Sequence, residues 1–344
     1  MHRQTIKKII SLVFAAALAM SLMTGCGGIN KDKTVMKVGD ENVSLGLANF
    51  MARYQQAMYE SYYGISEDSW SQNVDEETTY EDSVKDEIIK LLQNMVLERQ
   101  HAADFDAELT DEEKEAAAEA AKAFMDANDS AAKDAVTASE DIVTEYLELM
   151  TIQNKVESAI RDTVTEEDIT DEDALQKKMQ YVYFSFSETD AAGTVTMLDD
   201  DQKKDVKEKA DAFAKAAADA EDFAGLAVQQ GYLSEEATFD AETETPDPGL
   251  CEAAFDLKEG EVTDVIEGET GYYVAKLVSE LDREATDAKK PEVLADKQEE
   301  AVEKQLKAWK KETKIKVYKN RWKKVDFEKE GVTFKSEETE EAGD

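Results

Sequence analysis

The chain has 344 residues, with 40 Lys and Arg against 79 Asp and Glu, a formal net charge of −39, 2 Cys and 2 His. This length allows two or three domains around a sizeable core. The acidic balance argues against nucleic acid as a partner, because phosphate binding requires clustered Lys and Arg. With only two histidines, one at position 2, a His-bearing catalytic triad or a multi-His metal site is nearly excluded.

Residues 1–25 have the features of a secretory leader. Three basic residues and no acid precede an apolar stretch, Ile9 to Met23, which is too short to span a membrane. The stretch ends in LMTGC, which looks like the lipobox at which bacterial lipoproteins are cleaved and lipidated. That resemblance implies a lipidated Cys26, a tether from 26 to 34 and an extracytoplasmic chain held at the cell membrane. An ordinary signal peptide with a chance cysteine is the alternative.

Residues 35–178 are predicted to form a hairpin followed by helices. The segment VMKVGDENVS, residues 35–44, indicates two short strands around a Gly-Asp turn. Apolar residues at three- and four-residue spacing then predict helices over 45–63 and 76–104. The residues expected to face inward are Leu47, Phe50, Met51, Tyr54 and Met58 in the first helix, and Val84, Ile88, Leu91, Leu92 and Met95 in the second.

Two more helices follow. Thr110 and Glu113 form a capping-box pattern that predicts a helix to about residue 127. Ser139 opens another helix, which is expected to end near the acidic segment 165–173. Its predicted inward-facing residues are Ile142, Val143, Tyr146, Leu147, Met150 and Ile160.

A second domain is predicted to begin at Met179, where the composition changes. Residues 181–186, YVYFSF, are typical of a central strand. Helices are expected over 203–218 and 223–230, a loop containing Pro246, Pro248 and Gly249, and strands over 261–266 and 272–278. The run Asp199 to Asp201 lacks the spacing of a calcium loop and predicts a helix start. Neither a metal nor another cofactor is predicted.

The last structured segment is predicted to be a helix over 291–312 and a strand around Ile315 and Val317. One helix face carries Leu294, Ala301, Val302, Leu306 and Trp309. This face requires an apolar partner, which the N-terminal helices can supply. The acidic tail 336–344 is expected to be disordered.

The second domain resembles the parvulin (PpiC-type) family of peptidyl-prolyl cis-trans isomerases. In that family a helix pair with a Phe-x-x-Leu-Ala element precedes an Ala-Phe-x-Leu-x-x-Gly-Glu-Val turn and a final Gly-Tyr-His strand. The matching stretches here are ADAFAKAAADAEDFAGLAVQQG (210–231) and CEAAFDLKEGEVTDVIEGETGYYVAKLVSE (251–280). The matching residues are Ala254, Phe255, Leu257, Gly260, Glu261, Val262, Gly271 and Tyr272.

The flanking segments extend this resemblance to PrsA-type foldase lipoproteins and SurA-like chaperones. The fold class that this implies is α+β. A helical chaperone domain is expected from residues 35–178 and 282–335, with a parvulin-like small-sheet domain inserted over 179–281.

The candidate catalytic site departs from the parvulin pattern. Parvulins carry one His in their first strand and one after Gly-Tyr in their last strand, and the positions that match here are Tyr183 and Tyr273. Isomerisation rotates an amide over a barrier of roughly 18 to 20 kcal/mol without net proton transfer, so the loss of His weakens the enzyme interpretation without excluding it. Two tyrosine hydroxyls with Thr270 nearby, and Leu250 and Phe255 as an apolar wall, form the candidate site.

The alternative is that the residues of this candidate site only pack in the core or on the face of the sheet. Aromatic side chains in strands are more often core residues, and Phe255 is expected in the core. The family's apolar Met-to-Phe rim corresponds to Pro246 to Leu250. Cys251 has no histidine in its domain to act as a base and is expected to be a small buried or edge residue. His101 is expected to be an ordinary residue of the helical region.

The helical region is rich in Met and aromatic residues, most of which are expected in the core. Where part of that surface stays uncovered, Phe50, Tyr54, Met58 and Tyr62 are candidates for binding unfolded segments. The expected partners are unfolded or partly folded exported proteins and, through Cys26, the membrane. Formation of a homodimer is left open.

Three functions therefore remain. The first is a membrane-anchored extracytoplasmic foldase with a parvulin-like domain that lacks catalytic histidines. The second is an active prolyl isomerase with a tyrosine-based site. The third is an envelope scaffold or solute-binding lipoprotein, although the helical N-terminal half lacks the repeated βαβ units of solute-binding lobes.

Overall fold

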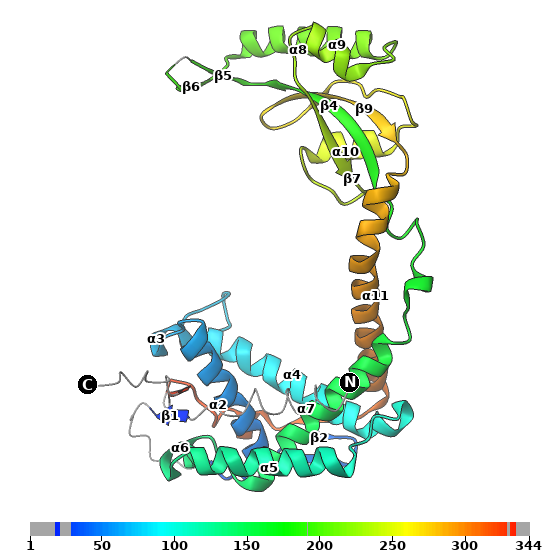
Figure 1. Ribbon diagram of the computed structural model, residues 1–344. Helices are drawn as coiled ribbons and strands as arrows, with labels where there is room; N and C mark the ends of the chain where they lie inside the picture. The colour runs from blue at the N-terminus through cyan, green and yellow to red at the C-terminus, as the bar shows by residue number, and fades with distance from the viewer. Residues whose placement is uncertain (1–17, 21–28, 191, 329–330, 335–344) are drawn as a thin grey trace, which may run out of the picture. The chain divides into compact units, whose positions relative to one another are not determined.

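The computed structural model describes residues 18–20, 29–190, 192–328 and 331–334. It combines helices with small sheets, which confirms the α+β prediction (Figure 1). The chain divides into two compact units. Unit 1 comprises residues 1–163 and 298–344, and unit 2 comprises residues 164–297. Unit 2 is therefore an insertion between the two stretches of unit 1.

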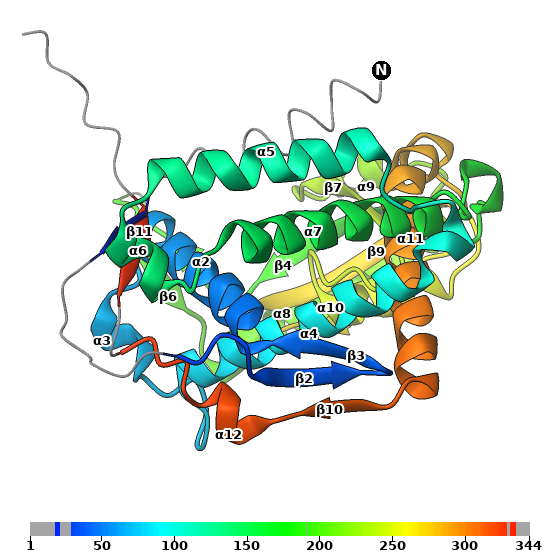
Figure 2. The ribbon, with the colours of Figure 1, turned by 90° about the horizontal axis from the view of Figure 1, so that it is seen from below.

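The sheet of unit 1 joins the two stretches. Strands β2 (Thr34–Val38) and β3 (Glu41–Ser44) form the predicted hairpin, with Gly39 at φ 59° in its turn. Strand β10 (Ile315–Val317) pairs antiparallel with β2, which gives the order β10-β2-β3 (Figure 2). Separately, β1 (Leu18–Met20) pairs antiparallel with β11 (Val332–Phe334).

The long helices of unit 1 form where the sequence predicts them, although α4 begins at Tyr80, four residues after the expected start. Ser44, Thr79, Thr110 and Ser139 each cap a helix by accepting a backbone N–H bond, and Thr110 and Glu113 form the capping box. The capped helices are α2 (Leu45–Tyr62), α4 (Tyr80–His101), α5 (Asp111–Ala127) and α7 (Glu140–Arg161). The short elements α3 (Glu67–Trp70), the 3-10 turn Ala102–Phe105, α6 (Ser130–Ala135) and α12 (Lys319–Trp322) were not predicted.

A single core holds unit 1 together. Val302, Leu306 and Trp309 of α11 (Arg283–Glu312) are buried in the same cluster as residues of α2, α4, α5 and α7, so the N-terminal helices are the predicted partner. Trp70 and Trp322 lie in this cluster too. The prediction for Leu91 is wrong: the side chain is exposed, because it lies beside the buried stripe of α4 that contains Ile88 and Leu92.

Unit 2 is a four-stranded antiparallel sheet with helices on both faces (Figure 1). The strand order is β7-β4-β9-β8, with β7 (Ser234–Phe239), β4 (Lys177–Ser185), β9 (Gly271–Ser279) and β8 (Ile266–Glu267). Helices α8 (Asp200–Ala217) and α9 (Phe223–Gln229) cover one face and α10 (Pro248–Phe255) covers the other. A small hairpin of β5 (Ser187–Thr189) and β6 (Val195–Met197) extends from β4, and a 3-10 turn spans Glu166–Asp168.

Three predictions in this half of the chain are wrong in detail. Pro248 and Gly249 lie in α10 rather than in a loop, since proline is tolerated in the first turn and Asp247 caps the helix. The predicted strand 261–266 is reduced to Ile266–Glu267 and a single bridge at Val262. Helix α11 starts at Arg283, eight residues before Pro291, because Asp282 caps it.

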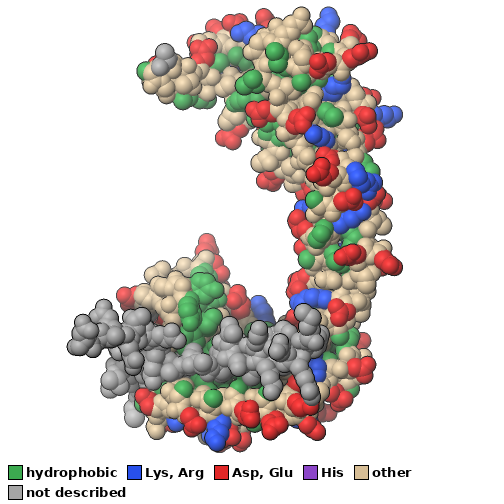
Figure 3. Space-filling view, in the orientation of Figure 1, with side chains coloured by type: hydrophobic (Ala, Val, Ile, Leu, Met, Phe, Trp, Pro, Cys, Tyr) green, Lys and Arg blue, Asp and Glu red, His purple; other side chains and the backbone are tan. Residues whose placement is uncertain are grey.

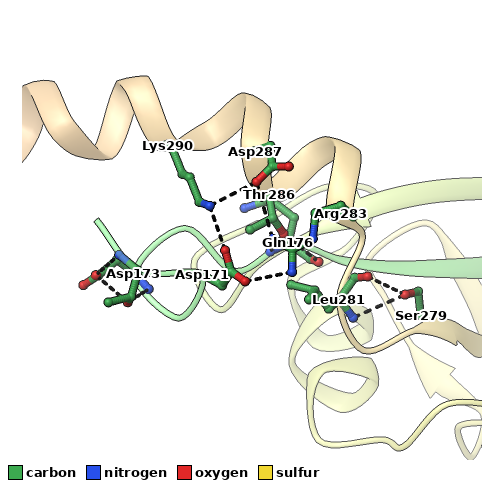
Figure 4. Close-up of polar contacts among 10 residues, drawn as sticks. Asp171, Asp173, Gln176, Ser279, Leu281, Arg283, Thr286, Asp287 and Lys290 are labelled. Atoms are coloured by element: carbon green, nitrogen blue, oxygen red, sulfur yellow. Dashed lines mark hydrogen bonds and ion pairs between the residues drawn. The ribbon is translucent and has the colours of Figure 1, made fainter. Parts of the chain in front are cut away.

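Polar contacts fix the start of β4 to the start of α11 (Figure 4). The backbone N–H of Gln176 donates to Thr286 Oγ1 at 3.1 Å, and the N–H of Asp282 donates to the carbonyl of Gln176 at 2.8 Å. Asp171 pairs with Arg283 and with Lys290, each at 2.7 Å. These two cations hold the pKa of the Asp171 carboxyl well below its usual range.

Candidate functional site

The strand register places the two candidate tyrosines directly opposite each other. Tyr183 of β4 pairs with Tyr273 of β9, and the ring centroids are 4.9 Å apart at an interplanar angle of 34°. Residues alternate along a strand, so both rings lie on the α10 face, together with Tyr181. The structure thus brings together Tyr183 and Tyr273, the two residues that the sequence analysis set at the parvulin histidine positions.

Thr270 lies beside both members of this pair. The Tyr183 hydroxyl donates to the Thr270 carbonyl at 2.7 Å, while its side chain is 37% exposed. Tyr273 is 7% exposed, and burial raises the pKa of its hydroxyl, although a hydrogen bond with the Thr270 side chain opposes the shift. The hydroxyl of Tyr273 therefore stays protonated at neutral pH and serves as a hydrogen-bonding group rather than as a base.

A third tyrosine extends the polar part of this face. Tyr181 donates its hydroxyl to Glu235 Oε2 at 2.7 Å, and burial, followed by this hydrogen bond, raises the pKa of the hydroxyl. Sequence reasoning missed Glu235 because β7, SEEATF, is too polar to be predicted as a strand. The alternation that places Glu235 beside Tyr181 is apparent only from the pairing of β4 with β7.

The residues expected to form an apolar wall are used for internal packing. Leu250 is fully buried, and Phe255 is half-buried. Lys177 Nζ lies 4.5 Å from the centroid of the Phe255 ring and donates to the Phe255 carbonyl at 2.6 Å. The Cys251 thiol is buried and donates to the Thr245 carbonyl at 3.3 Å, and burial raises its pKa. Cys251 is thus the small buried residue that was predicted.

The start of α10 packs tightly against the turn before β9. Asp247 Oδ1 accepts the Leu250 N–H at 3.0 Å. A Cβ on Gly268 would lie 2.4 Å from Asp247 Oδ2 and 2.8 Å from Tyr273 Cε2. Asp247 therefore places a carboxylate beside the tyrosine pair, in the segment that sequence reasoning assigned to an apolar rim.

In unit 1 the four candidate peptide-binding residues differ widely in exposure. The prediction is wrong for Phe50 and Tyr54, because both side chains pack in the core, where Phe50 contacts the rings of Phe124 and Tyr146. Burial raises the pKa of Tyr54 to about 12. Met58 is half-buried, and Tyr62 is 69% exposed. Of these four side chains, only Met58 and Tyr62, toward the end of α2, reach the surface.

The remaining predicted residues fall in different settings. His101 stacks on Trp309 with ring centroids 4.4 Å apart, as an ordinary residue of the helical region. Asp199 caps α8, which confirms the predicted helix start. Cys26 lies outside the described residues. No helix in the described part of the chain combines the length and apolar character needed to cross a membrane.

Comparisons with known proteins find sequence relatives for part of the chain. Residues 185–287 match the family model described as the PPIC-type PPIase domain. Foldase protein PrsA of Clostridium botulinum strain Langeland is 28% identical over 190 residues, which cover 52% of this chain and 55% of that protein. The PrsA of strain 657 is also 28% identical, over 192 residues. The chain therefore spans about half the length of the curated relatives it matches.

Solved structures give weaker likenesses. The peptidylprolyl isomerase PrsA of Bacillus cereus is 22% identical, with a TM-score of 0.31, over 75% of this chain and 100% of that one. A SurA-like chaperone of Campylobacter jejuni is 10% identical, with a TM-score of 0.29, over 83% of this chain and 98% of that one. The sequence matches carry the assignment: residues 185–287 form a PPIC-type, parvulin domain, within a chain that is related to the PrsA-type foldases.

Proposed function

We propose that this protein is an extracytoplasmic foldase, anchored to the membrane through Cys26, that binds unfolded exported proteins. Its relation to PrsA foldases and the lipobox-like LMTGC segment support this proposal. The parvulin domain serves as a structural or peptide-binding module and lacks imidazole-based isomerase chemistry.

The tyrosine pair is the main observation in favour of a binding role for the parvulin domain over a catalytic one. The parvulin resemblance sets Tyr183 and Tyr273 at the positions of the two histidines, and the Tyr183 hydroxyl already donates to the Thr270 carbonyl. Leu250 is fully buried, so it offers no surface to grip a proline ring. Rotation of an Xaa-Pro amide requires an apolar slot and hydrogen bonds that favour the twisted state. This arrangement of residues supports binding over catalysis.

The client-binding surface is assigned to the end of α2 and its surroundings. We call this surface the tyrosine patch and define it as Tyr59, Tyr62, Tyr63 and Phe334. Tyr62 and Tyr63 are each 69% exposed, and the Tyr62 ring lies 5.9 Å from that of Phe334. Apolar side chains gather on unit 1 near α2 and α3 (Figure 3). Aromatic side chains with a polar tip suit varied apolar segments.

Catalysis is tested by measuring cis/trans exchange of short Xaa-Pro peptides by NMR, with catalytic amounts of the chain from Gly27 onward. No acceleration is expected across several Xaa residues. Acceleration that disappears in Tyr183→Phe and persists in His101→Ala would overturn the loss of catalysis. It would establish the alternative, an isomerase with a tyrosine site, for which the close Tyr183–Tyr273 pair is the favouring observation.

Client binding is tested by light scattering of a denatured enzyme, such as rhodanese, diluted into buffer with the protein. The native chain should suppress aggregation, and the double variant Tyr62→Ser, Tyr63→Ser should lose most of this effect. The matched control is Leu91→Ser, which removes an exposed apolar side chain on α4. Equal suppression by the native chain and the double variant would refute the tyrosine patch as the binding surface.

Anchoring is tested separately by mass spectrometry of the protein isolated from bacterial membranes. Diacylglyceryl modification of Cys26 and absence of residues 1–25 are expected. Unmodified Cys26 in the mature chain would refute the lipid anchor and leave the chaperone proposal to the aggregation assay.

A further inference from the structure

A short segment of unit 1 reverses the charge of the chain. Residues 310–324, KKETKIKVYKNRWKK, carry eight Lys or Arg and one Asp or Glu, whereas the whole chain has 40 basic and 79 acidic residues. The segment covers the end of α11, β10 and α12. The overall composition of the chain, in which acidic residues outnumber basic ones, does not explain this cluster of cations.

Six of the eight cations of this segment face solvent. We call the exposed set the basic strip and define it as Lys311, Lys314, Lys316, Lys319, Lys323 and Lys324. Within the described residues, none of the six lies within 4.0 Å of a carboxylate oxygen. By contrast, the buried Lys85 of α4 pairs with Glu81 at 3.0 Å. The basic strip is therefore available to an external anion.

Strand β10 contributes Lys316 to the strip, and the position of this lysine destabilises the β10-β2-β3 sheet. Lys316 of β10 lies directly opposite Lys37 of β2, and like charges in such a pair repel. Asp40 approaches Lys37 only to 3.7 Å. Lys316 Nζ and the Arg321 guanidinium carbon lie 4.8 and 4.4 Å from the centroid of the Tyr318 ring, so these cations gather around one exposed edge. An anion bound outside the sheet would relieve the repulsion.

The strip lies next to the point where the predicted tether enters the fold. The Tyr318 N–H donates to the Val35 carbonyl at 2.8 Å, and the Arg321 guanidinium donates to the Thr34 carbonyl. In Figure 2, β10 and α12 run beside β2. Seven residues lie between Cys26 and Thr34, and the eight residue-to-residue steps of an extended chain span at most about 30 Å. A lipidated Cys26 would keep the strip close to the membrane.

We propose that the basic strip binds the anionic headgroups of membrane phospholipids. Clustered Lys residues next to a membrane attachment point are attracted to anionic leaflets, and the attraction acts within a Debye length of about 10 Å at 0.1 M salt. The acidic remainder of the protein is repelled by the same surface. The two forces together select one face of unit 1 for the membrane and leave its other faces to solvent.

Neighbouring acidic residues limit the strip on one side. Lys319 and Lys323 line a groove of about 520 Å³ whose opposite wall, on α4, carries Asp82 and Asp86. The groove has both signs of charge, so the outer lysines, rather than the groove itself, form the lipid-facing surface.

The proposal that the strip lies at the membrane rests on the proposed lipid anchor at Cys26. The affinity of the strip for anionic lipid does not depend on that anchor. The test therefore uses the chain from Gly27 onward, which lacks Cys26. This chain keeps every residue of the unit 1 core that the structure describes, from Ile29 onward. A lack of lipidation at Cys26 and a lack of lipid binding by the strip would therefore be detected in separate experiments.

The experiment is co-sedimentation with vesicles of phosphatidylcholine alone or mixed with phosphatidylglycerol, at low and high salt. Binding to the anionic vesicles should exceed binding to the neutral ones, and high salt should abolish the difference. Lys314→Glu with Lys324→Glu, two strip lysines that lie outside the groove, should reduce the anionic binding about tenfold or more. The control, Lys114→Glu with Lys122→Glu on α5, changes the net charge equally and should have a smaller effect.

Two outcomes would overturn the proposal. Equal losses in the two double variants would show that net charge, not the strip, governs binding. Strip-dependent binding of soluble polyglutamate without binding to anionic vesicles would assign the strip to acidic polypeptides instead of lipid.

Discussion

At the residue scale, Glu98 of α4 is the most unusual side chain of unit 1. It is fully buried, and neither carboxylate oxygen makes a direct hydrogen bond within the described residues. Burial, and secondly the charge of Glu157, raises its pKa to about 7, although Gln153, Lys310 and Arg161 oppose this shift. The folded chain therefore holds a proton at this site that the unfolded chain releases near its ordinary pKa of 4.5.

Replacement of Glu98 by Gln should change how stability depends on pH. A raised folded-state pKa means that the contribution of Glu98 is fully present below pH 4.5 and is lost as the pH rises through 7. Urea unfolding should find Glu98→Gln close to the native chain at pH 4 and more stable at pH 8, by on the order of 3 kcal/mol. Glu115→Gln, at an exposed site, is the control. An equal difference at both pH values would contradict the assignment.

Gly271 is required by the close approach of β4 and β9. A Cβ there would lie 2.3 Å from Tyr183 Cε2 and 2.4 Å from the Phe184 carbonyl oxygen. Because the second atom belongs to the backbone, Gly271→Ala should destabilise unit 2 by about 1–3 kcal/mol and displace Tyr183. Thermal unfolding measures the first effect, and the NMR shifts of Thr270 measure the second. A Cβ on Gly249 would have its nearest contacts at 3.3 and 3.4 Å, so Gly249→Ala should destabilise unit 2 less. Equal destabilisation by the two substitutions would refute this account.

At the element scale, α11 organises both units because its first half belongs to unit 2 and its second half to unit 1. In unit 2 its first turns hold the segment that leads into β4 through Gln176 and Asp171. In unit 1 its later turns bury Val302, Leu306 and Trp309.

Asp171→Asn tests the polar part of this arrangement. The change removes the charge that pairs with Arg283 and Lys290, and exposed pairs add little to global stability. We expect an unchanged urea midpoint but faster proteolysis within residues 164–176, as local opening becomes easier. Asp211→Asn, which breaks the exposed pair with Lys207 on α8, should leave that cleavage rate unchanged. An unchanged rate in Asp171→Asn would show that the backbone contacts of Gln176 suffice.

Helices with strong caps and apolar periodicity could be predicted from the sequence, and α2, α5 and α7 begin within a residue of expectation. The tyrosine pair could be predicted too. The Gly-Tyr element of the parvulin motif identifies the position of Tyr273, and the aromatic run YVYFSF identifies the strand that contains Tyr183. Strand β7 could not, because its only fully buried side chain is Phe239. The contact of Asp247 with the turn at Gly268 could not either, because it depends on how α10 packs. The basic strip is not apparent from the average charge of the chain, because the acidic residues elsewhere outnumber its lysines.

At the scale of the whole molecule, unit 1 is a discontinuous structure. Its sheet takes β10 from the C-terminal stretch and β2 from the N-terminal stretch. Unit 2, in contrast, is one continuous stretch with its own two cores, one on each face of the sheet. Strand β1 lies within the predicted leader, so cleavage after residue 25 would remove the partner of β11.

A chain that ends at Lys297 should separate the two units. It loses β10 and the buried turns of α11, so unit 1 should no longer fold, while unit 2 keeps every residue of both its cores. Calorimetry should show the transition of unit 2 alone. A chain that ends at Phe334 is the control and should retain both transitions. Retention of both in the shorter chain would refute the dependence of unit 1 on its C-terminal stretch.

The placement of the aromatic residues has an optical consequence. All three tryptophans, Trp70, Trp309 and Trp322, lie in the core of unit 1, whereas the tyrosines around Tyr183 and Tyr273 belong to unit 2, which has no tryptophan. Indole emission therefore reports on unit 1 alone. In the intact, unlabelled protein, quenching or a wavelength shift on addition of a client would identify the unit that responds.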